Sequence, residues 1–148
     1  MNLDDLDRFR EIDADDMLRH IDALPDQLDA AWEHAHSLDL PLDLSDIERV
    51  IICGMGGSAI GGDLLAALAD AAPISVNRAY DLPAHVEGPG TLVIGVSHSG
   101  NTEELLAAVG QGLERGARLL AITTGGKLAE LTARAGGTLW TYDYVSQP

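Results

Sequence analysis

The sequence has little positive charge and only one cysteine. Nine Lys and Arg residues stand against 24 Asp and Glu, and Lys127 is the only lysine in 148 residues. Nucleic acids and anionic membranes are bound by clustered basic side chains, so neither is an expected partner. The single cysteine, Cys53, has no second cysteine for an internal disulfide, which favours a cytoplasmic protein.

Long apolar runs are missing as well. No stretch approaches the roughly 20 apolar residues that cross a bilayer as a helix. Residues 1–16 are acidic, whereas a secretory signal peptide begins with basic residues. Aromatic residues make up only 4% of the chain, but 46% of its residues are apolar, which is enough for a buried core. The composition therefore predicts a globular chain the size of one domain.

Residues 1–46 are predicted to form an acidic helical leader that packs on the remaining domain. Fifteen of the 24 acidic residues precede Val50. Apolar residues recur at helical spacing, at Met17, Leu18, Ile21 and Leu24. Pro25 predicts a break after this first helix, and residues 26–37 are predicted to form a second one.

Residues 47–148 show short apolar runs that alternate with helical patterns. Strands are predicted at 50–53, 74–77, 91–96, 118–123 and 138–142, and helices at 59–71, 102–113 and 127–135. Strands joined through helices form parallel sheets with helices on both faces. The pattern predicts a three-layer αβα sandwich of the flavodoxin-like type, with a five-stranded parallel sheet in the order 2-1-3-4-5.

A glycine-rich loop, GMGGSAIGG at residues 54–62, follows the first of these strands. Glycines let main-chain amides approach an anion closely, and the start of the following helix adds partial positive charge. Gly54, Gly56 and Ala59 also fit the dinucleotide fingerprint, and Arg78 after the second strand would suit the 2′-phosphate of NADP. Phosphate binding and dinucleotide binding therefore both remain open at this loop.

A second loop, SHSGNT at residues 97–102, follows the third strand and favours a phosphate monoester. Its three hydroxyls and the amides around Gly100 are neutral donors suited to the terminal oxygens of such a group. Asn101 and Glu104 fit a helix capping box, which leaves the three hydroxyls unexplained. Strands one and three are neighbours in the predicted order, so both loops should line one crevice at the carboxyl edge of the sheet.

These two loops, the leader and the segment GGKL at 125–128 resemble the sugar isomerase (SIS) domain family. The resemblance is strongest to the N-terminal half of bifunctional phosphoglucose/phosphomannose isomerases. It implies a phosphorylated hexose bound in the two loops, by Gly56, Gly57, Ser58, Ser97, Ser99, Gly100, Asn101 and Thr102. It also implies interconversion of glucose 6-phosphate or mannose 6-phosphate with fructose 6-phosphate, and one departure is His98, where the family more often has tyrosine.

In such isomerases the glutamate that moves the proton and the histidine that opens the ring lie in a second half, beyond the position matching Pro148. The resemblance thus implies no catalytic residue here, little turnover by the chain alone, and association with a second half or a second copy. No metal-ligand cluster is evident in the sequence, and no metal or cofactor is expected. A non-catalytic phosphosugar sensor and an NADP-type domain are the alternatives.

Overall fold

The computed structural model describes residues 6–38, 43–69 and 72–143. It divides into two compact units, Met1–Asp39 and Leu40–Pro148, and each is described by itself. Among the described residues, no helix combines the length and the apolar character that a membrane crossing requires.

The first unit contains three helices, α1 (Leu6–Ile12), α2 (Met17–Asp22) and α3 (Leu24–Ser37). Helix α2 starts where it does because both carboxylate oxygens of Asp13 accept main-chain amides, from Met17 at 2.7 Å and Leu18 at 2.8 Å. Both bonds lower the pKa of the Asp13 carboxyl, and the bond from the Leu18 amide has the larger effect. The predicted break at Pro25 was wrong, because α2 ends before Ala23 and Pro25 lies in the first turn of α3, where proline is tolerated. Helix α1 was not predicted.

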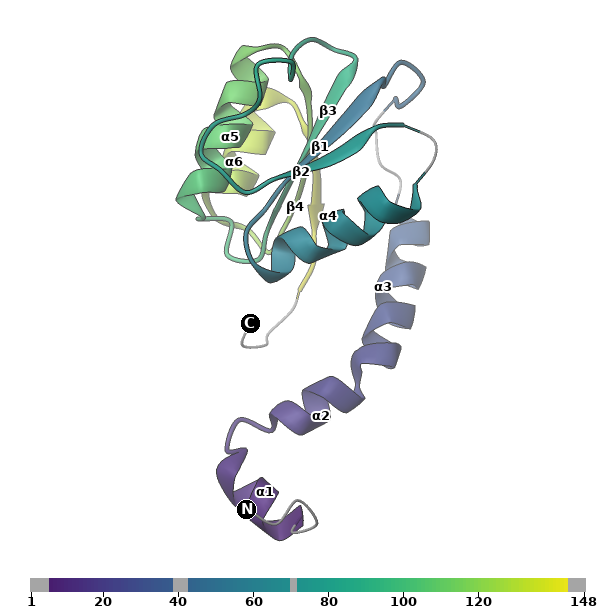
Figure 1. Cartoon of the computed structure of the whole chain (residues 1–148), viewed down its shortest axis with the longest axis vertical. Helices are drawn as coiled ribbons and strands as arrows, with labels where there is room; N and C mark the ends of the chain where they lie inside the picture. The colour runs from purple at the N-terminus through teal and green to yellow at the C-terminus, as the bar shows by residue number, and fades with distance from the viewer. Residues whose placement is uncertain (1–5, 39–42, 70–71, 144–148) are drawn as a thin grey trace. The chain divides into compact units, whose positions relative to one another are not determined.

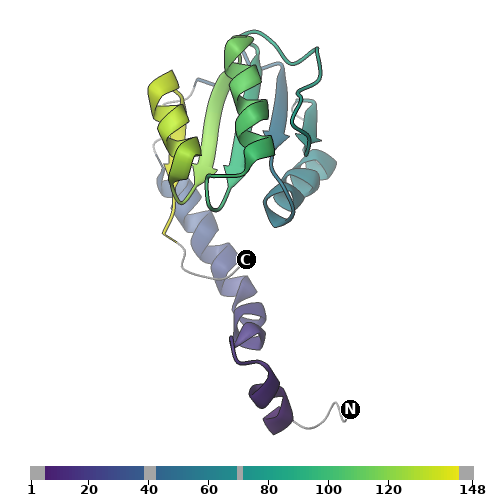
Figure 2. The same ribbon diagram turned by 90° about the vertical axis from the view of Figure 1, so that its left-hand side faces the viewer.

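The second unit is a parallel sheet with helices on both of its faces (Figures 1 and 2). Its elements are β1 (Arg49–Cys53), α4 (Gly57–Leu68), β2 (Ile74–Asn77), β3 (Thr91–Ser97), α5 (Glu103–Glu114), β4 (Arg118–Thr123), α6 (Gly126–Ala135) and β5 (Thr138–Thr141). The five strands are all parallel and lie in the order β2-β1-β3-β4-β5. The predicted fold class and strand order are therefore confirmed.

The two faces of the sheet are covered by different helices. Helix α4 packs on β1 and β2, where Gly62 lies against Ile52 and Val76. Helices α5 and α6 pack together over β3 and β4. Their buried residues, among them Leu105 and Leu128, form one core with strand residues of that face such as Val93. Since successive strand residues point to opposite faces, the apolar runs of β1 and β3 serve both layers.

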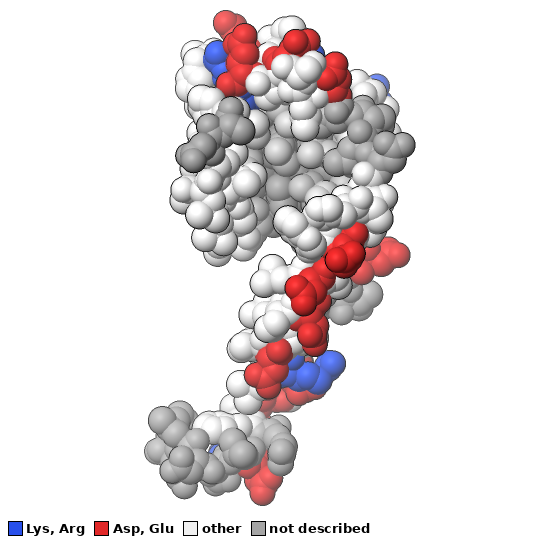
Figure 3. Space-filling model, turned by 90° about the vertical axis from the view of Figure 1, so that its right-hand side faces the viewer, with Lys and Arg blue, Asp and Glu red and all other residues white. Residues whose placement is uncertain are grey.

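Charge is distributed differently on the two units. Acidic side chains run along the helices of the first unit, as Figure 3 shows. On the face of the second unit that is turned to the viewer, charged side chains gather at the upper rim. The acidic character of the sequence therefore belongs chiefly to the helical leader.

Candidate phosphate-binding site at the carboxyl edge of the sheet

The glycine loop (residues 54–62) and the serine loop (residues 97–102) lie next to each other in the structure. The first follows β1 and the second follows β3, and these strands pair with Cys53 opposite Gly95. At the end of β1, a Cβ on Gly54 would lie 3.2 Å from the carbonyl oxygen of Val96. The loop therefore passes close to the end of β3, as expected for the crevice between neighbouring strands at the carboxyl edge of a parallel sheet.

The glycine loop offers uncommitted donors at the start of α4. Gly56 and Gly57 are exposed, and the space where their side chains would stand is open. The amides of Ser58 and Ala59 are used inside the turn, by the carbonyls of Met55 and Gly56. The amides of Gly56 and Gly57 and the Ser58 hydroxyl donate to no group among the residues the structure describes.

Ser97 and Thr102 pair at the base of the serine loop. Their hydroxyl oxygens are 3.0 Å apart, and the Ser97 hydroxyl also accepts the Gly100 amide at 3.1 Å. Ser97 is 3% exposed, so its hydroxyl faces the loop itself. One hydroxyl hydrogen of the pair makes their mutual bond, and the other is left over. Either hydroxyl can be the donor of this bond; with Ser97 as the donor, the spare hydrogen lies on Thr102, the more exposed partner.

Ser99 presents the second hydroxyl of this loop at the surface. Its oxygen accepts the Asn101 amide at 3.2 Å, which makes a tight turn of the loop. The Ser99 hydrogen remains able to donate outward. The first-turn amides of α5, at Glu103 and Glu104, have no partner inside the helix either. The loop thus combines two outward hydroxyls with a helix start.

The predicted capping box of Asn101 and Glu104 was wrong. The residue that precedes α5 is Thr102, and no side chain caps this helix start. Instead, the Asn101 side chain bridges two segments: its Nδ2 donates to the Ser99 carbonyl at 2.8 Å, and its Oδ1 accepts the Lys127 amide at 3.3 Å. Asn101 therefore positions the serine loop against the start of α6.

The β4–α6 turn, residues 123–128 at the end of β4 and the start of α6, holds the serine loop from the other side. The His98 carbonyl accepts both the amide of Thr124, at 3.2 Å, and its hydroxyl, at 2.7 Å. The Gly100 carbonyl accepts the amide of Leu128 at 2.9 Å. We did not predict this support, although its sequence TTGGK repeats the combination of hydroxyls and glycines seen in the other two loops.

Gly100 is the residue on which this contact depends. It is buried, has a φ of 66°, and a Cβ there would collide with the carbonyl oxygen of Gly125 and lie 2.9 Å from the Thr123 hydroxyl. A positive φ and a close main-chain approach both favour glycine. The serine loop and the turn therefore interlock at this point.

Two features near the loops involve titratable side chains: the buried thiol of Cys53, and a contact between His98 and Tyr142. Burial raises the pKa of the Cys53 thiol to about 12, opposed in part by a hydrogen bond with Asn77. A neutral, buried thiol packs in the core and is a poor nucleophile. His98 Nδ1 lies 3.5 Å from the Tyr142 hydroxyl, beyond the end of β5. Desolvation raises the pKa of Tyr142.

Arg78, which would suit the 2′-phosphate of NADP, forms an ion pair with Asp63 of α4. The Asp63 carboxylate therefore offsets the positive charge of Arg78 that would be needed to bind the 2′-phosphate of NADP. Within the described part of the chain, no cluster of three or more His, Cys, Asp or Glu residues is placed to hold a metal ion.

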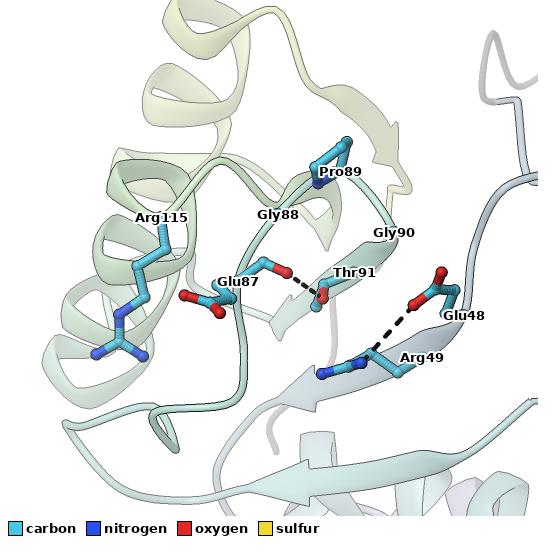
Figure 4. Close-up of a pocket in the computed structure, with 8 residues that line it drawn as sticks. All are labelled: Glu48, Arg49, Glu87, Gly88, Pro89, Gly90, Thr91 and Arg115. Carbon is cyan, nitrogen blue, oxygen red and sulfur yellow. Dashed lines mark hydrogen bonds and ion pairs between the residues drawn. The ribbon is translucent and has the colours of Figure 1, made fainter.

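A separate pocket of about 540 Å³ opens at the opposite, amino edge of the sheet (Figure 4). Its two arginines are engaged by main-chain carbonyls: Arg49 donates to His85 at 2.7 Å, and Arg115 donates to Pro83 at 2.9 Å. Both therefore fasten the connection between β2 and β3. This pocket lies away from the predicted loops and takes no part in the candidate site.

Comparisons with known proteins bear on the ancestry and the fold of the chain, although no protein-family model matches it. Over 135 residues the chain is 42% identical to the bifunctional phosphoglucose/phosphomannose isomerase of Caldicellulosiruptor bescii, covering 89% of this chain and 40% of that protein. It is 36% identical over 106 residues to the D-glucosamine-6-phosphate 4-epimerase of Sulfolobus acidocaldarius, covering 71% and 33% of the two chains. The chain thus spans well under half the length of these relatives.

Among solved structures, tagatose-6-phosphate ketose/aldose isomerase of Escherichia coli matches with a TM-score of 0.51 and 27% identity. The match covers 84% of this chain and 35% of that one. The shared fold and the sequence identity confirm the resemblance inferred from the two loops. The chain is therefore related to the bifunctional phosphoglucose/phosphomannose isomerases, as the resemblance to sugar isomerase (SIS) domains predicted.

Proposed function

We propose that this domain binds the phosphate of a phosphorylated hexose between the serine loop and the glycine loop. The observation that carries the proposal is the hydrogen-bond arrangement around Ser97. The Ser97 hydroxyl accepts the Gly100 amide and lies 3.0 Å from the Thr102 hydroxyl, and we propose that the hydroxyls of Thr102 and Ser99 donate outward to the ligand. Together with the open amides of Gly56 and Gly57, they suit a group with several terminal oxygens.

We further propose that the reaction served is the interconversion of glucose 6-phosphate or mannose 6-phosphate with fructose 6-phosphate. The support is the identity with bifunctional isomerases over 89% of this chain. An aldose–ketose isomerisation needs a base at the carbon beside the carbonyl and an acid to open the ring. We propose that these groups come from a second half or partner, so that the isolated chain binds without turning over.

A second candidate ligand is glucosamine 6-phosphate, since one relative is a D-glucosamine-6-phosphate 4-epimerase. Both candidates require the same phosphate site and differ in the groups that meet the sugar. A sensor of phosphosugars would use the same site without catalysis, and a dinucleotide-binding domain would respond to NADP.

The partner is proposed to cover the exposed side of α4. Ile60, Leu64 and Leu68 follow one another at a spacing of four and are 56%, 60% and 80% exposed. Side chains at this spacing form one stripe along a helix. Contiguous exposed apolar surface usually marks a contact with another protein surface.

The test is calorimetric titration of the chain with fructose 6-phosphate, glucose 6-phosphate, mannose 6-phosphate, glucosamine 6-phosphate, NADP and unphosphorylated fructose. We expect the hexose phosphates to bind and fructose and NADP not to bind. Thr102→Val and Ser99→Ala should each weaken binding by about tenfold, because each removes a hydrogen bond to a charged oxygen. Ser75→Ala, which removes an exposed hydroxyl on β2, is the matched control.

Unchanged affinity in both loop variants would refute the site. Binding of NADP in place of hexose phosphates would favour the dinucleotide alternative. Sustained isomerisation by the chain alone would refute the proposal that the acid and base come from elsewhere.

A further inference from the structure

We propose that Lys127, the only lysine of the chain, supplies the positive charge that pairs with the ligand's phosphate. This inference rests on the proposed function and deepens it, because the predicted cradle consists of uncharged donors only. The phosphate of a hexose monophosphate carries close to two negative charges at neutral pH. A site that holds it with neutral groups alone leaves that charge without a counter-ion.

The electrostatic surroundings of the serine loop make the need for a cation greater. Glu103 and Glu104 occupy the first turn of α5, directly after Thr102. Their carboxylates lie close enough to Tyr80 to raise the pKa of its hydroxyl, with Glu104 the larger cause. Acidic side chains in a first turn offset the partial positive charge of a helix start. The amides of α5 are therefore a weaker anion site than an unaccompanied helix start would be.

Lys127 is fastened to the serine loop through its own main chain and through both neighbours. Its amide donates to Asn101 Oδ1 at 3.3 Å, and Asn101 Nδ2 donates to the Ser99 carbonyl at 2.8 Å. On one side, Gly126 lies against the Ser99 carbonyl; on the other, the Leu128 amide donates to the Gly100 carbonyl. Because a lysine has a flexible four-carbon stem, a main chain fastened this close to the loop leaves the ammonium able to turn towards a phosphate bound there.

The placement of this lysine is otherwise unfavourable. It stands in the first turn of α6, where the helix dipole disfavours a cation. Its side chain is exposed, and its ammonium makes no ion pair or hydrogen bond with any described residue. A residue that opposes the local preference without a compensating contact is often one kept for function. An anion bound at the serine loop would supply the missing contact.

The test is titration of the full chain with fructose 6-phosphate, in wild type and in Lys127→Gln, Lys127→Arg and Arg134→Gln. Lys127→Gln should bind about tenfold more weakly, the loss expected for one charged hydrogen bond, and Lys127→Arg should retain most of the affinity. Arg134 is exposed in the last turn of the same helix, so Arg134→Gln makes the same change in net charge away from the loop. It should bind as wild type does.

Two further measurements separate charge pairing from a structural role. Without ligand, Lys127→Gln should melt at or above the wild-type temperature, because a cation has been removed from a helix start. Raising the salt concentration from about 50 mM to about 500 mM should weaken wild-type binding more than binding by Lys127→Gln.

Equal affinity of wild type and Lys127→Gln would overturn this inference while leaving the proposed function intact. Equal losses in Lys127→Gln and Arg134→Gln would overturn it too, since they would indicate a diffuse field. A wild-type chain that binds no hexose phosphate would overturn both the proposed function and this inference.

Discussion

The interlock between the serine loop and the β4–α6 turn can be tested with a matched pair of glycine substitutions. Gly100 and Gly136 have almost the same φ, 66° and 67°, in the left-handed region. They differ in their surroundings: a Cβ on Gly100 would collide with the Gly125 carbonyl, whereas a Cβ on Gly136 meets nothing within 4 Å. An alanine at each position therefore shares the conformational cost and differs in the steric cost.

The two costs have known magnitudes. A non-glycine residue in the left-handed conformation costs about 1–2 kcal/mol, and this should be the whole effect of Gly136→Ala. Forcing a methyl group into a closely packed site adds about 1–3 kcal/mol. Gly100→Ala should therefore reduce the free energy of unfolding by about 2–5 kcal/mol, and it should also displace the hydroxyls of the loop from their positions.

Urea unfolding measures the difference directly. If the free energy of unfolding keeps the same dependence on urea concentration, a shift of the midpoint is a change in stability. Fructose 6-phosphate titration then reports on the site, where only Gly100→Ala should lose affinity. Equal destabilisation by the two substitutions would refute the interlock. It would mean that the methyl group at position 100 adds no steric cost to the cost of the left-handed backbone conformation.

Two other predictions concern the core and the partner surface. Burial raises the pKa of the Cys53 thiol from 9.0 to about 12, so between these pH values this thiol ionises only in the unfolded chain. The free energy of unfolding should therefore fall as the pH rises from 9 towards 12. Cys53→Ala, compared by urea unfolding across this range, should lose that slope, and a slope kept in the variant would assign it to other groups. For the partner surface, Leu64→Lys should shift any self-associated wild-type chain towards monomer in light scattering, whereas Glu130→Lys on the exposed face of α6 should not. A self-associated species that Leu64→Lys leaves unchanged would exclude α4 from that contact.

The fold was largely predictable because its signals are local. Short apolar runs separated by helical patterns placed all five strands within a residue or two of their observed ends. Right-handed crossovers and the switch point then gave the strand order. Helix α1 was missed because its seven residues, LDRFREI, make only about two turns and include only three apolar positions.

The site was predictable in place but only partly in detail. The hydroxyls of the serine loop were identified from their number, but their direction depends on contacts that the spacing does not encode. Ser97 turns inward to the Gly100 amide, and Asn101 reaches α6. Both contacts follow from tertiary packing, since Asn101 and Lys127 are 26 positions apart. A local rule for helix caps therefore gave the wrong role for Asn101.

The dependence of the serine loop on the β4–α6 turn also bears on how the protein is made. Domains acquire structure as the chain is synthesised, from the N-terminal side. The loop at residues 97–102 is translated well before Thr124 and Leu128, which provide the donors for its carbonyls. A ribosome paused just after α5 would carry a nascent chain with every hydroxyl of the loop present but without the Thr124 and Leu128 donors that hold its carbonyls. Competence to hold a ligand would thus be acquired only after residue 128 has been synthesised.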